Sequence, residues 1–402
     1  MTFDFTTLPD RHGRDALAVD DIGSGLGNAP GAPKDGYDAI PMWIADMNFA
    51  TAPSITGAVA ERLSHPLFGY FEPSQAYFDA IVDWQRRRNG VEGLTAEHIG
   101  YENGVLGGLV SALRAFAEPG DAILVHSPTY VGFTMAIEGA GYRIEHSPLK
   151  RDADGVWRMD YEDMDRRLKA NNIHMAVFCS PHNPAGRVWE REEIERALDV
   201  YRANDCVVVS DEIWSDLILE GHRHTPTQSV NEDARRRVIA LYAPSKTFNL
   251  AGLIGSYHIV YDKYLRDRLV SSSSKTCYNE MNVLSMHALI GAYCDEGERW
   301  LEELRVVLTA NVDAAMAYFE GVDGVEVARP QGTYMLFLDC ERWCVDHGVA
   351  MDELIRRGWD VGVAWQDGRK FGGTHTLRVN LALPRERVDE ALRRMAEHVF
   401  VD

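Results

Sequence analysis

The sequence has no excess of basic residues, no long apolar run and few cysteines. Its 61 Asp and Glu outnumber its 41 Lys and Arg, for a net charge of −20, so it lacks the positive surplus that neutralises nucleic-acid phosphates. No run of about 18 apolar residues occurs, which excludes a membrane-spanning helix, and the opening MTFDFTTLPDRHG has no apolar core of a signal peptide. Six cysteines scattered over 402 residues indicate a reducing compartment. These absences favour a soluble, cytoplasmic protein that binds neither nucleic acid nor membrane.

Several common kinds of site are also missing. The chain contains no G-x-S-x-G motif and no readable Ser-His-Asp order, which disfavours a serine hydrolase. Cys340 and Cys344 are a close pair without a second pair to accompany them, so no zinc site is expected. His222 and His224 lie in a polar stretch and are interpreted as solvated. The glycines within residues 21–37 follow no strand and precede prolines, which excludes a dinucleotide fingerprint.

From about residue 99, short apolar runs alternate with amphipathic stretches. Several runs, such as AILV, MAVF and VVV, are apolar throughout, as expected for a mainly parallel sheet with helices over both faces. The alternation predicts an α/β fold with right-handed crossovers. The predicted strands are Ala122–Val125, Ile144–Ser147, Met175–Cys179, Val207–Ser210, Val238–Tyr242 and Ser256–Val260, and the predicted helices are Leu106–Ala117, Val131–Ala140, Tyr161–Ala170 and Glu190–Ala203.

After about residue 290 the pattern changes. The long helical stretch GERWLEELRVVLTANVDAAMAYFEG leads to strands predicted near Val325–Ala328, Tyr334–Leu338 and Thr376–Asn380, which are interpreted as a smaller α+β domain. At 402 residues the chain is long enough for two domains. The predicted division is an N-terminal arm over 1–45 that joins the small domain, a large ligand-binding domain over 46–288 and a small C-terminal domain over 289–402.

Three of the apolar runs lead directly to a chemically distinctive residue. MAVFCS is followed by Asn183, VVVS by Asp211 and VIALY by Lys246. In open α/β sheets, ligands bind beyond the carboxyl ends of the strands. Taken alone, an Asn-Pro dipeptide is usually a turn, an Asp after a strand is usually a helix N-cap, and a Lys is usually a surface charge. The three together, each just past a buried strand, predict one common ligand site.

Pyridoxal 5′-phosphate (PLP), an electron sink that a protein must hold and orient, needs all of these groups. An amine must form a Schiff base with the cofactor and remove the substrate's α-proton, the role predicted for Lys246. A carboxylate must keep the pyridine nitrogen protonated, which suits Asp211. An amide donor can hold the phenolate oxygen, which suits Asn183. The sequence therefore predicts a PLP site in which Lys246 is catalytic.

Further residues complete this predicted site. Tyr130, after the AILV strand, is placed to stack on the cofactor ring and is counted as catalytic. A glycine-rich helix start offers backbone amides on Val105 and Leu106 for the phosphate, and Ser245 adds a hydroxyl beside the lysine. Arg378, in THTLRVN, has the planar guanidinium that binds a substrate carboxylate bidentately. A surface strand arginine is the alternative for that residue.

The motifs around these residues resemble those of a known family. SPHNPAGRVW, VVVSDEIWSDL, APSKTFNLAGL and LRVNLALPRERV are similar to those of fold-type-I PLP enzymes of the aspartate-aminotransferase superfamily. Within it, PMWIADMNFATAPSI, HPLFGY and SKTFNLAGL resemble the cystathionine β-lyase or C–S lyase branch. The resemblance runs from about residue 2 to the C-terminus. It implies a large domain with a mainly parallel seven-stranded sheet covered by helices, and a smaller α+β domain.

The resemblance also implies a homodimer with active sites at the subunit interface. By match to the family's FGY, Tyr70 would reach the cofactor phosphate of the neighbouring subunit, although composition alone equally allows core packing beside Phe68 and Phe71. The backbone near Ile44 and Ala45 would help to close over the substrate.

Two positions depart from the family pattern. Trp214 is expected at the cofactor, where many relatives carry a tyrosine whose hydroxyl bonds the phenolate oxygen. Ile254 stands where many aminotransferases carry an arginine that holds the phosphate. The phosphate is therefore expected to depend on backbone amides, on Ser245 and on the partner's Tyr70.

Three functions are compatible with these residues. The first hypothesis is a PLP-dependent C–S β-lyase that releases a thiol, pyruvate and ammonia from cystathionine or a related cysteine S-conjugate, which the lyase-like N-terminal block favours. The second is a class I/II aminotransferase, which would use every residue named above. The third is a non-catalytic PLP-binding module, which the presence of Lys246 and the lack of a helix-turn-helix or basic arm disfavour.

Overall fold

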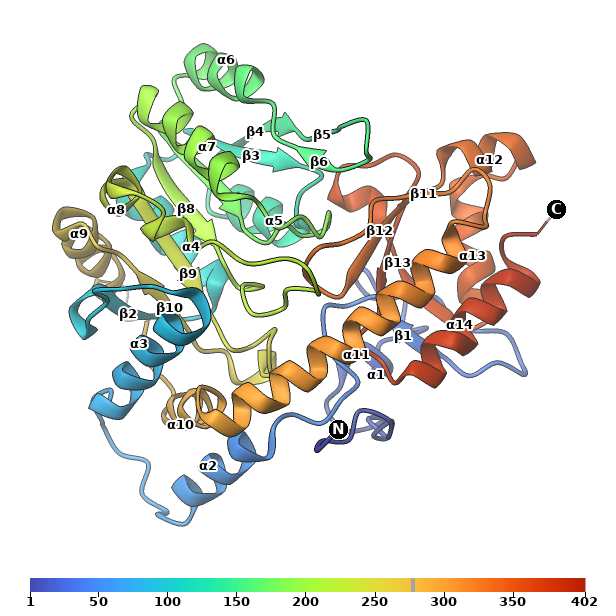
Figure 1. Cartoon of the computed structure of the whole chain (residues 1–402), viewed down its shortest axis with the longest axis horizontal. Coiled ribbons are helices and arrows are strands. Elements are labelled where there is room, and N and C mark those ends of the chain that lie inside the picture. The colour runs from blue at the N-terminus through green and yellow to red at the C-terminus, as the bar shows by residue number, and fades with distance from the viewer. Residues whose placement is uncertain (276–278, 402) are drawn as a thin grey trace.

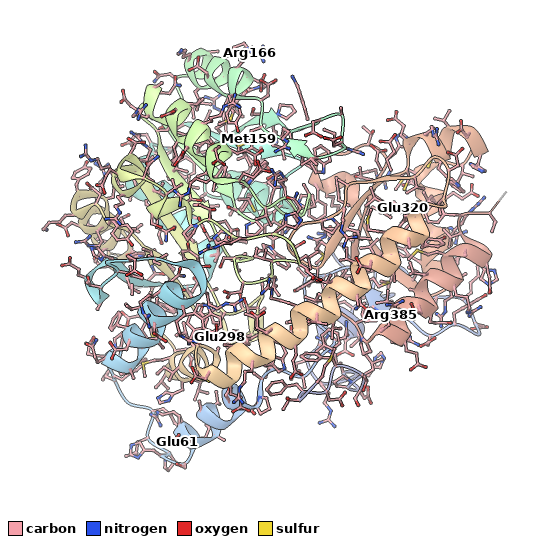
Figure 2. The ribbon with its side chains drawn as sticks, in the orientation of Figure 1. Glu61, Met159, Arg166, Glu298, Glu320 and Arg385 are labelled. Atoms are coloured by element: carbon pink, nitrogen blue, oxygen red, sulfur yellow. The ribbon has the colours of Figure 1, made fainter. Side chains whose placement is uncertain are left out.

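The computed structural model describes residues 1–275 and 279–401. Figure 1 shows a larger α/β lobe and a smaller lobe, with the long helix α11 (Asp295–Phe319) running from one to the other. Figure 2 marks Glu298 and Glu320 near the two ends of this helix. Over the described residues, none of the helices is long and apolar enough to cross a membrane. The five described cysteines are free, and Cys277 lies outside the described residues.

Seven strands form the larger sheet, in the order β2-β10-β9-β8-β7-β3-β4. The five strands from β9 to β4 run parallel, and β10 runs antiparallel to both β9 and β2, which confirms the predicted mainly parallel α/β sheet. Strand β2, IGYE, was not predicted because it has a glycine and a glutamate instead of an apolar run. The strands are β2 Ile99–Glu102, β3 Ala122–Ser127, β4 Arg143–Pro148, β7 Met175–Cys179, β8 Val207–Asp211, β9 Val238–Tyr242 and β10 Ser256–Ile259.

Helices cover both faces of this sheet, which explains the uninterrupted apolar runs. In β7, Met175 and Val177 join the apolar cluster on one face, whereas Ala176 and Phe178 join the cluster on the other. Burial of a side chain as large as Phe178 stabilises the fold by roughly 1.5–3 kcal/mol. One face carries α4 (Val105–Phe116), α5 (Val131–Gly139) and α9 (Lys263–Ser274), and the other carries α6 (Tyr161–Asn171), α7 (Arg191–Ala203) and α8 (Glu232–Arg237).

Helix α4 lies unusually close to the sheet. A Cβ atom added at Gly108 would come within 2.8 Å of the Leu241 side chain of β9, so only glycine allows this approach. The helix begins at Val105, directly after Gly104, whose φ of +80° is one that glycine adopts without strain. The glycine-rich sequence therefore places the amino end of α4 against the carboxyl edge of the sheet.

Five strands form the smaller sheet, in the order β1-β13-β14-β12-β11. Its first strand comes from the N-terminal arm and pairs parallel with β13, in keeping with the predicted arm, while the exact boundaries at residues 45 and 288 stay predictions. The three-residue β1 contains a proline, and neither it nor β13 was predicted. The elements are β1 Ile40–Met42, β11 Glu326–Val327, β12 Met335–Asp339, α12 Glu341–His347, α13 Met351–Asp360, β13 Val363–Asp367, β14 Thr376–Asn380 and α14 Arg385–His398.

After β1 the chain crosses to the larger lobe and forms α2 (Pro53–Leu63), which packs against α10 (Val283–Ala292), as α3 (Gln75–Asn89) also does. Glu61, near the end of α2, is labelled at the lower extremity of Figure 2. The α2–α3 loop that follows exposes Leu67, Phe68 and Tyr70, and Tyr70 is fully exposed. The alternative of core packing for Tyr70 within its own chain is therefore wrong. The remaining elements are the short helix α1 (Leu17–Asp20) and the two-stranded ribbon of β5 (Lys150–Arg151) and β6 (Trp157–Arg158).

Candidate active site

The carboxyl ends of three neighbouring parallel strands meet at one cavity. Asn183 follows β7, Asp211 ends β8 and Lys246 follows β9, and all three residues line a cavity of about 350 Å³. Because β7, β8 and β9 are adjacent and parallel, their ends lie at the same edge of the sheet. The structure therefore brings together the three residues on which the predicted site depends.

Most of the other predicted site residues line the same cavity. They come from the segment before α2, the start of α4, the β3–α5 turn and the loops after β8 and β9, namely Ala45, Val105, Leu106, Tyr130, Trp214 and Ser245. Three predicted residues do not line it within the described chain. Ile44 lies beside Ala45, Arg378 lies behind Asn183 and donates to its Oδ1 atom at 3.2 Å, and Tyr70 is exposed on the α2–α3 loop.

Asp211 and Asn183 are buried but incompletely paired. Asp211 Oδ1 accepts the Ile213 N–H at 3.0 Å, the one hydrogen bond to its side chain among the described residues. Burial raises the pKa of Asp211 to about 7. The bond from Arg378 fixes Asn183 Oδ1 and leaves the Nδ2 amide without a partner in the described part of the chain. The cavity therefore presents one acceptor and one donor to a ligand.

The Lys246 side chain is held by a backbone carbonyl of the segment before α2. Its Nζ atom donates to the Ala45 carbonyl at 2.8 Å and lies 6.0 Å from the centre of the Trp214 ring. Burial, and next the positive charge of Arg378, lower the pKa of Lys246 to about 8. Roughly a tenth of the amine is therefore neutral at pH 7, far more than for an ordinary lysine, and the neutral form is the one that acts as a nucleophile or base.

Arg378 is buried in strand β14, and the alternative of a surface arginine is wrong. Its Nη2 atom donates to the Trp43 carbonyl at 3.1 Å and to Gln366 Oε1 at 2.5 Å, and its guanidinium lies 4.4 Å from the centre of the Phe371 ring. Its Nε atom has no hydrogen-bond partner within the described residues. Burial lowers the pKa of Arg378 to about 10, so the guanidinium remains charged at neutral pH.

The amino end of α4 forms the part of the cavity suited to an anion. The first N–H groups of a helix lack intrahelical partners and carry partial positive charge, and here they belong to Val105 and Leu106. Ile254 lines the same wall with a φ of +55°. That conformation is strained for a β-branched residue, and such strain concentrates at functional sites.

Trp214 contributes a flat, apolar wall. It is buried, and its ring lies edge-on to Tyr334 with centroids 4.8 Å apart and planes at 74°. Its indole N–H makes no hydrogen bond with the described residues, which distinguishes it from the buried indole of Trp189, whose Nε1 atom donates to the Cys179 carbonyl at 2.9 Å. The indole can only donate, so Trp214 could bind only an acceptor on a ligand.

A polar network next to Asp211 is centred on Glu212, and both carboxylate oxygens of Glu212 have partners in it. Glu212 accepts bonds from Ser210, from Tyr242 at 3.0 Å and from the Thr227 N–H, and it contacts His224 Nε2 at 2.5 Å. The interpretation of His224 as a solvated loop histidine is wrong, because it is only 5% exposed. The burial of His224 was not predictable from the local sequence, because its partner carboxylate, Glu212, follows a strand 12 residues earlier.

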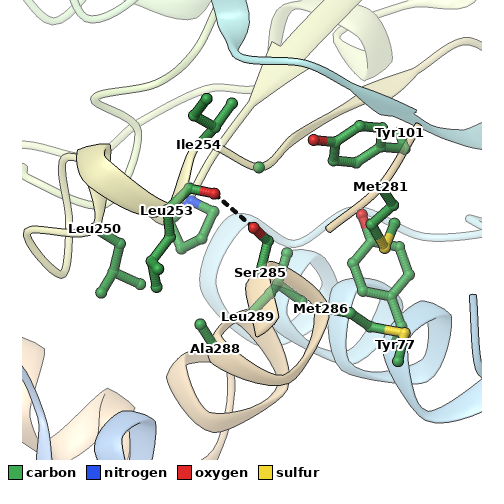
Figure 3. Close-up of a pocket in the computed structure, with 12 residues that line it drawn as sticks. Tyr77, Tyr101, Leu250, Leu253, Ile254, Met281, Ser285, Met286, Ala288 and Leu289 are labelled. Atoms are coloured by element: carbon green, nitrogen blue, oxygen red, sulfur yellow. Dashed lines mark hydrogen bonds between the residues drawn. The ribbon is translucent and has the colours of Figure 1, made fainter. Parts of the chain in front are cut away.

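A second, smaller cavity adjoins the first and shares Ile254 and Gly255 with it. Figure 3 shows it between the loop at Leu250–Ile254 and helix α10, where Ser285 Oγ donates to the Leu253 carbonyl at 2.5 Å. Its volume of about 10 Å³ accommodates roughly one water molecule. Of these two adjoining cavities, only the larger has room for a ligand of amino-acid or cofactor size.

The family model for aminotransferase class I and II matches residues 40–395, a span that includes every lining residue of the larger cavity. The chain belongs to the aminotransferase class I and II family. This membership agrees with the resemblance carried by the SKTFN and LRVN motifs.

The chain is also similar to individual C–S lyases and to a PLP-containing structure. The chain is 34% identical over 361 residues to cystathionine β-lyase PatB of Bacillus subtilis (strain 168), covering 89% of this chain and 92% of the relative. The structure is similar to that of cystalysin from Treponema denticola, which contains PLP, with a TM-score of 0.89, 30% identity and coverage of 98% of each chain. It is also similar to the PLP-bound C–S lyase from Staphylococcus hominis, with a TM-score of 0.88, 26% identity and coverage of 100% and 99%.

Sequence reasoning missed part of the cavity of this aminotransferase-family chain. Apart from Asn103 and Cys179, the residues missed are apolar or glycine and carry no chemical signal of their own: Ile213, Ala243, Ala251, Ile254 and Gly255. Ile254 had been noted only for the arginine that it lacks. For the other missed residues, the one available signal was that they lie close to the end of a predicted strand.

Proposed function

We propose that this protein is a PLP-dependent carbon–sulfur β-lyase, which acts on cystathionine or a related cysteine S-conjugate and releases a thiol, pyruvate and ammonia. The observation that carries the proposal is the convergence of Asn183, Asp211 and Lys246 on one cavity. Membership of the aminotransferase class I and II family and the similarity to a cystathionine β-lyase over 89% of the chain support it.

The residues of the cavity fit PLP. When bound, the cofactor supplies an electron sink for the negative charge that develops on the substrate's α-carbon. The incompletely paired carboxylate of Asp211 suits a protonated ring nitrogen, and the Nδ2 amide of Asn183 suits the phenolate oxygen. We assign the phosphate to the amides of Val105 and Leu106 and to the Ser245 hydroxyl. We place Tyr130 and Trp214 beside the ring, as the aromatic walls of the cofactor site.

The substrate side of the site follows from the remaining contacts. Arg378 would exchange part of its contacts with Trp43 and Gln366 for the substrate's α-carboxylate, which it can bind bidentately. The backbone at Ile44 and Ala45 would close over the bound amino acid. Lys246 would hold the cofactor and, once freed, remove the α-proton, a role for which its pKa of about 8 is suited.

We further propose a homodimer in which Tyr70 reaches the cofactor phosphate of the neighbouring subunit. The fully exposed Tyr70, with the exposed Leu67 and Phe68, is the kind of apolar surface that is usually covered by a partner. Mixing Tyr70→Phe and Lys246→Ala subunits tests this, since a hybrid dimer has one site with both residues intact. The mixture should regain activity that neither variant has alone, whereas independent sites would give no recovery. We assign the protein to the cytoplasm, in keeping with its free cysteines.

Product analysis without a keto acid tests the reaction itself. Cystathionine, cystine and methionine are supplied side by side, and pyruvate and ammonia are followed over time. A lyase turns over many times under these conditions. An aminotransferase, the alternative that the family model keeps open, stops after one half-reaction per site, and that outcome would replace the lyase assignment. Lys246→Ala should release no pyruvate, and its normal turnover would exclude the proposed role of the lysine.

A further inference from the structure

The motifs SKTFN and LRVN each contain an asparagine with no role in the proposed reaction, Asn249 and Asn380. Their side chains contact the same segment, residues 43–48, which we call the strap. It joins β1 of the smaller sheet to the residues before α2, and Ala45 within it lines the active-site cavity. The strap is irregular and mostly buried. Its backbone polar groups therefore need partners from elsewhere in the chain.

Asn380 holds the strap from the smaller sheet. Its Nδ2 atom donates to the carbonyls of Ile44 at 2.7 Å and Asp46 at 2.6 Å. Its Oδ1 atom accepts the Ala382 N–H at 2.7 Å, which orients the amide. Asn380 lies two positions after Arg378 in β14, so the two side chains leave the same face of that strand.

Asn249 holds the strap from the larger sheet. Its Oδ1 atom accepts the Met47 N–H at 3.1 Å and its Nδ2 atom donates to the Met47 carbonyl at 2.9 Å, much as a neighbouring strand would. Its φ of +58° is tolerated by Asn and Asp better than by most residues. Asn249 lies three residues after Lys246, in the same run of turns after β9.

Five consecutive carbonyls of the strap region are bound by side chains. Those of residues 43–47 accept, in order, from Arg378, Asn380, Lys246, Asn380 and Asn249, and the Met47 carbonyl also accepts from Arg11 at 3.3 Å. The bonds from Arg378 and Lys246 compete with the roles that we assign to those residues, because the guanidinium must also bind a carboxylate and the amine must react. The bonds of the two asparagines do not compete with the reaction, and neither do those of Arg11 to Met47, Asn48 and Asp46.

We propose that Asn249 and Asn380 are positioning residues that clamp the strap and thereby set the spacing between Lys246 and Arg378. This inference rests on the proposed roles of Lys246 and Arg378 in the reaction. Through the strap, the turn that carries the proton-removing amine is tied to the strand that carries the carboxylate-binding guanidinium. Loosening the Asn380 clamp releases the strap on the side of Arg378, and loosening the Asn249 clamp releases it on the side of Lys246.

The test uses Asn380→Asp and Asn249→Asp, which keep the accepted N–H bonds and remove the donated ones. The matched control is Asn311→Asp in α11, because the Nδ2 atom of this buried asparagine also donates to two carbonyls, Leu381 at 2.9 Å and Leu383 at 2.8 Å. It involves the same loop as Asn380 but makes no contact with the strap. Hydrogen exchange of the peptide spanning residues 43–48 and steady-state kinetics are measured on all three variants.

We expect exchange of the strap amides to accelerate roughly tenfold in both test variants and not in the control. Asn380→Asp should raise KM roughly tenfold or more with little change in kcat, and Asn249→Asp should mainly lower kcat. Unchanged strap exchange in Asn380→Asp, or an equal rise in KM in Asn311→Asp, overturns the proposal. The exchange result does not depend on the reaction, so it separates failure of the clamp from failure of the proposed lyase activity.

Discussion

Asp211 and Glu212 are adjacent buried carboxylates at the end of one strand, yet their surroundings are opposite. Asp211 faces the cavity, accepts a single side-chain hydrogen bond, and has a pKa that burial raises to about 7. Glu212 faces the network behind the sheet and accepts bonds from Ser210, Thr227 and Tyr242 beside His224. Although burial opposes it, the paired His224 and the hydrogen bonds lower the pKa of Glu212.

The difference separates a carboxylate kept for a ligand from one used for structure. Buried polar groups in folded proteins are almost always paired, so an incompletely paired one indicates a missing partner. The partner that suits Asp211 is a cationic ring nitrogen, which would stabilise its charged form. Glu212 already has its partners, and it contributes rigidity to the strand end that positions Asp211.

The largest expected effect is on activity, when the carboxylate that faces the cavity, Asp211, is changed. Asp211→Asn removes the charge while keeping the shape, so kcat/KM should fall at least about a hundredfold. Glu212→Gln, which alters the neighbouring carboxylate in the same way, should cost much less activity per folded molecule. Steady-state kinetics on cofactor-saturated protein measure both, and a fully active Asp211→Asn enzyme would contradict the assigned role.

The next largest effect is on stability, when the carboxylate of the buried network, Glu212, is changed. Glu212→Ala leaves His224, Tyr242 and Ser210 without their common acceptor, so the free energy of unfolding should fall by about 3–5 kcal/mol. Urea unfolding of the cofactor-free protein measures the change, because bound cofactor would add its own stabilisation. Asp211→Asn serves as the control and should cost little stability. Equal losses in the two variants would remove the distinction between the carboxylates.

The pH dependence of stability sharpens the comparison. The folded-state pKa of Asp211, about 7, lies above its ordinary value of 3.8, so between these values the folded protein binds more protons than the unfolded chain. Its contribution therefore makes the cofactor-free protein less stable as pH rises from about 4 to 7, by up to about 4 kcal/mol. Asp211→Asn should abolish this slope. Glu212 acts in the opposite sense, because its lowered pKa stabilises the fold above its ordinary pKa and the gain is lost on acidification.

The smallest expected effect concerns backbone strain on the cavity side. Ile254→Gly relieves the φ of +55°, so the free energy of unfolding should rise by about 1 kcal/mol after the greater entropy of glycine in the unfolded chain is subtracted. Ile254→Val keeps a β-branched side chain and should bring no gain. Thermal unfolding of both variants checks this, and a clear destabilisation by glycine would show that the Ile254 side chain matters more than its backbone.

Much of the fold and the candidate site was predictable from sequence because both depend on local patterns. Short apolar runs predicted six of the seven strands in the larger sheet. The residues that follow three of these runs are the ones that meet at the active-site cavity. Strands β1, β2 and β13 were missed because each includes proline, glycine or polar residues in place of an uninterrupted apolar run. His224 was misread because its partner, Glu212, belongs to another element and only the fold brings the two together.

The sequence by itself determined the carboxyl edge of the larger sheet, since parallel strands end on the same side and the residue after each run must lie there. Only the tertiary structure decided what opposes that edge. The strap meets Asn249 and Asn380 across separations of 202 and 336 residues, and it joins Lys246 to Arg378 across the two sheets. No local pattern encodes such contacts, because they depend on how two sheets pack and on which buried carbonyls remain to be paired.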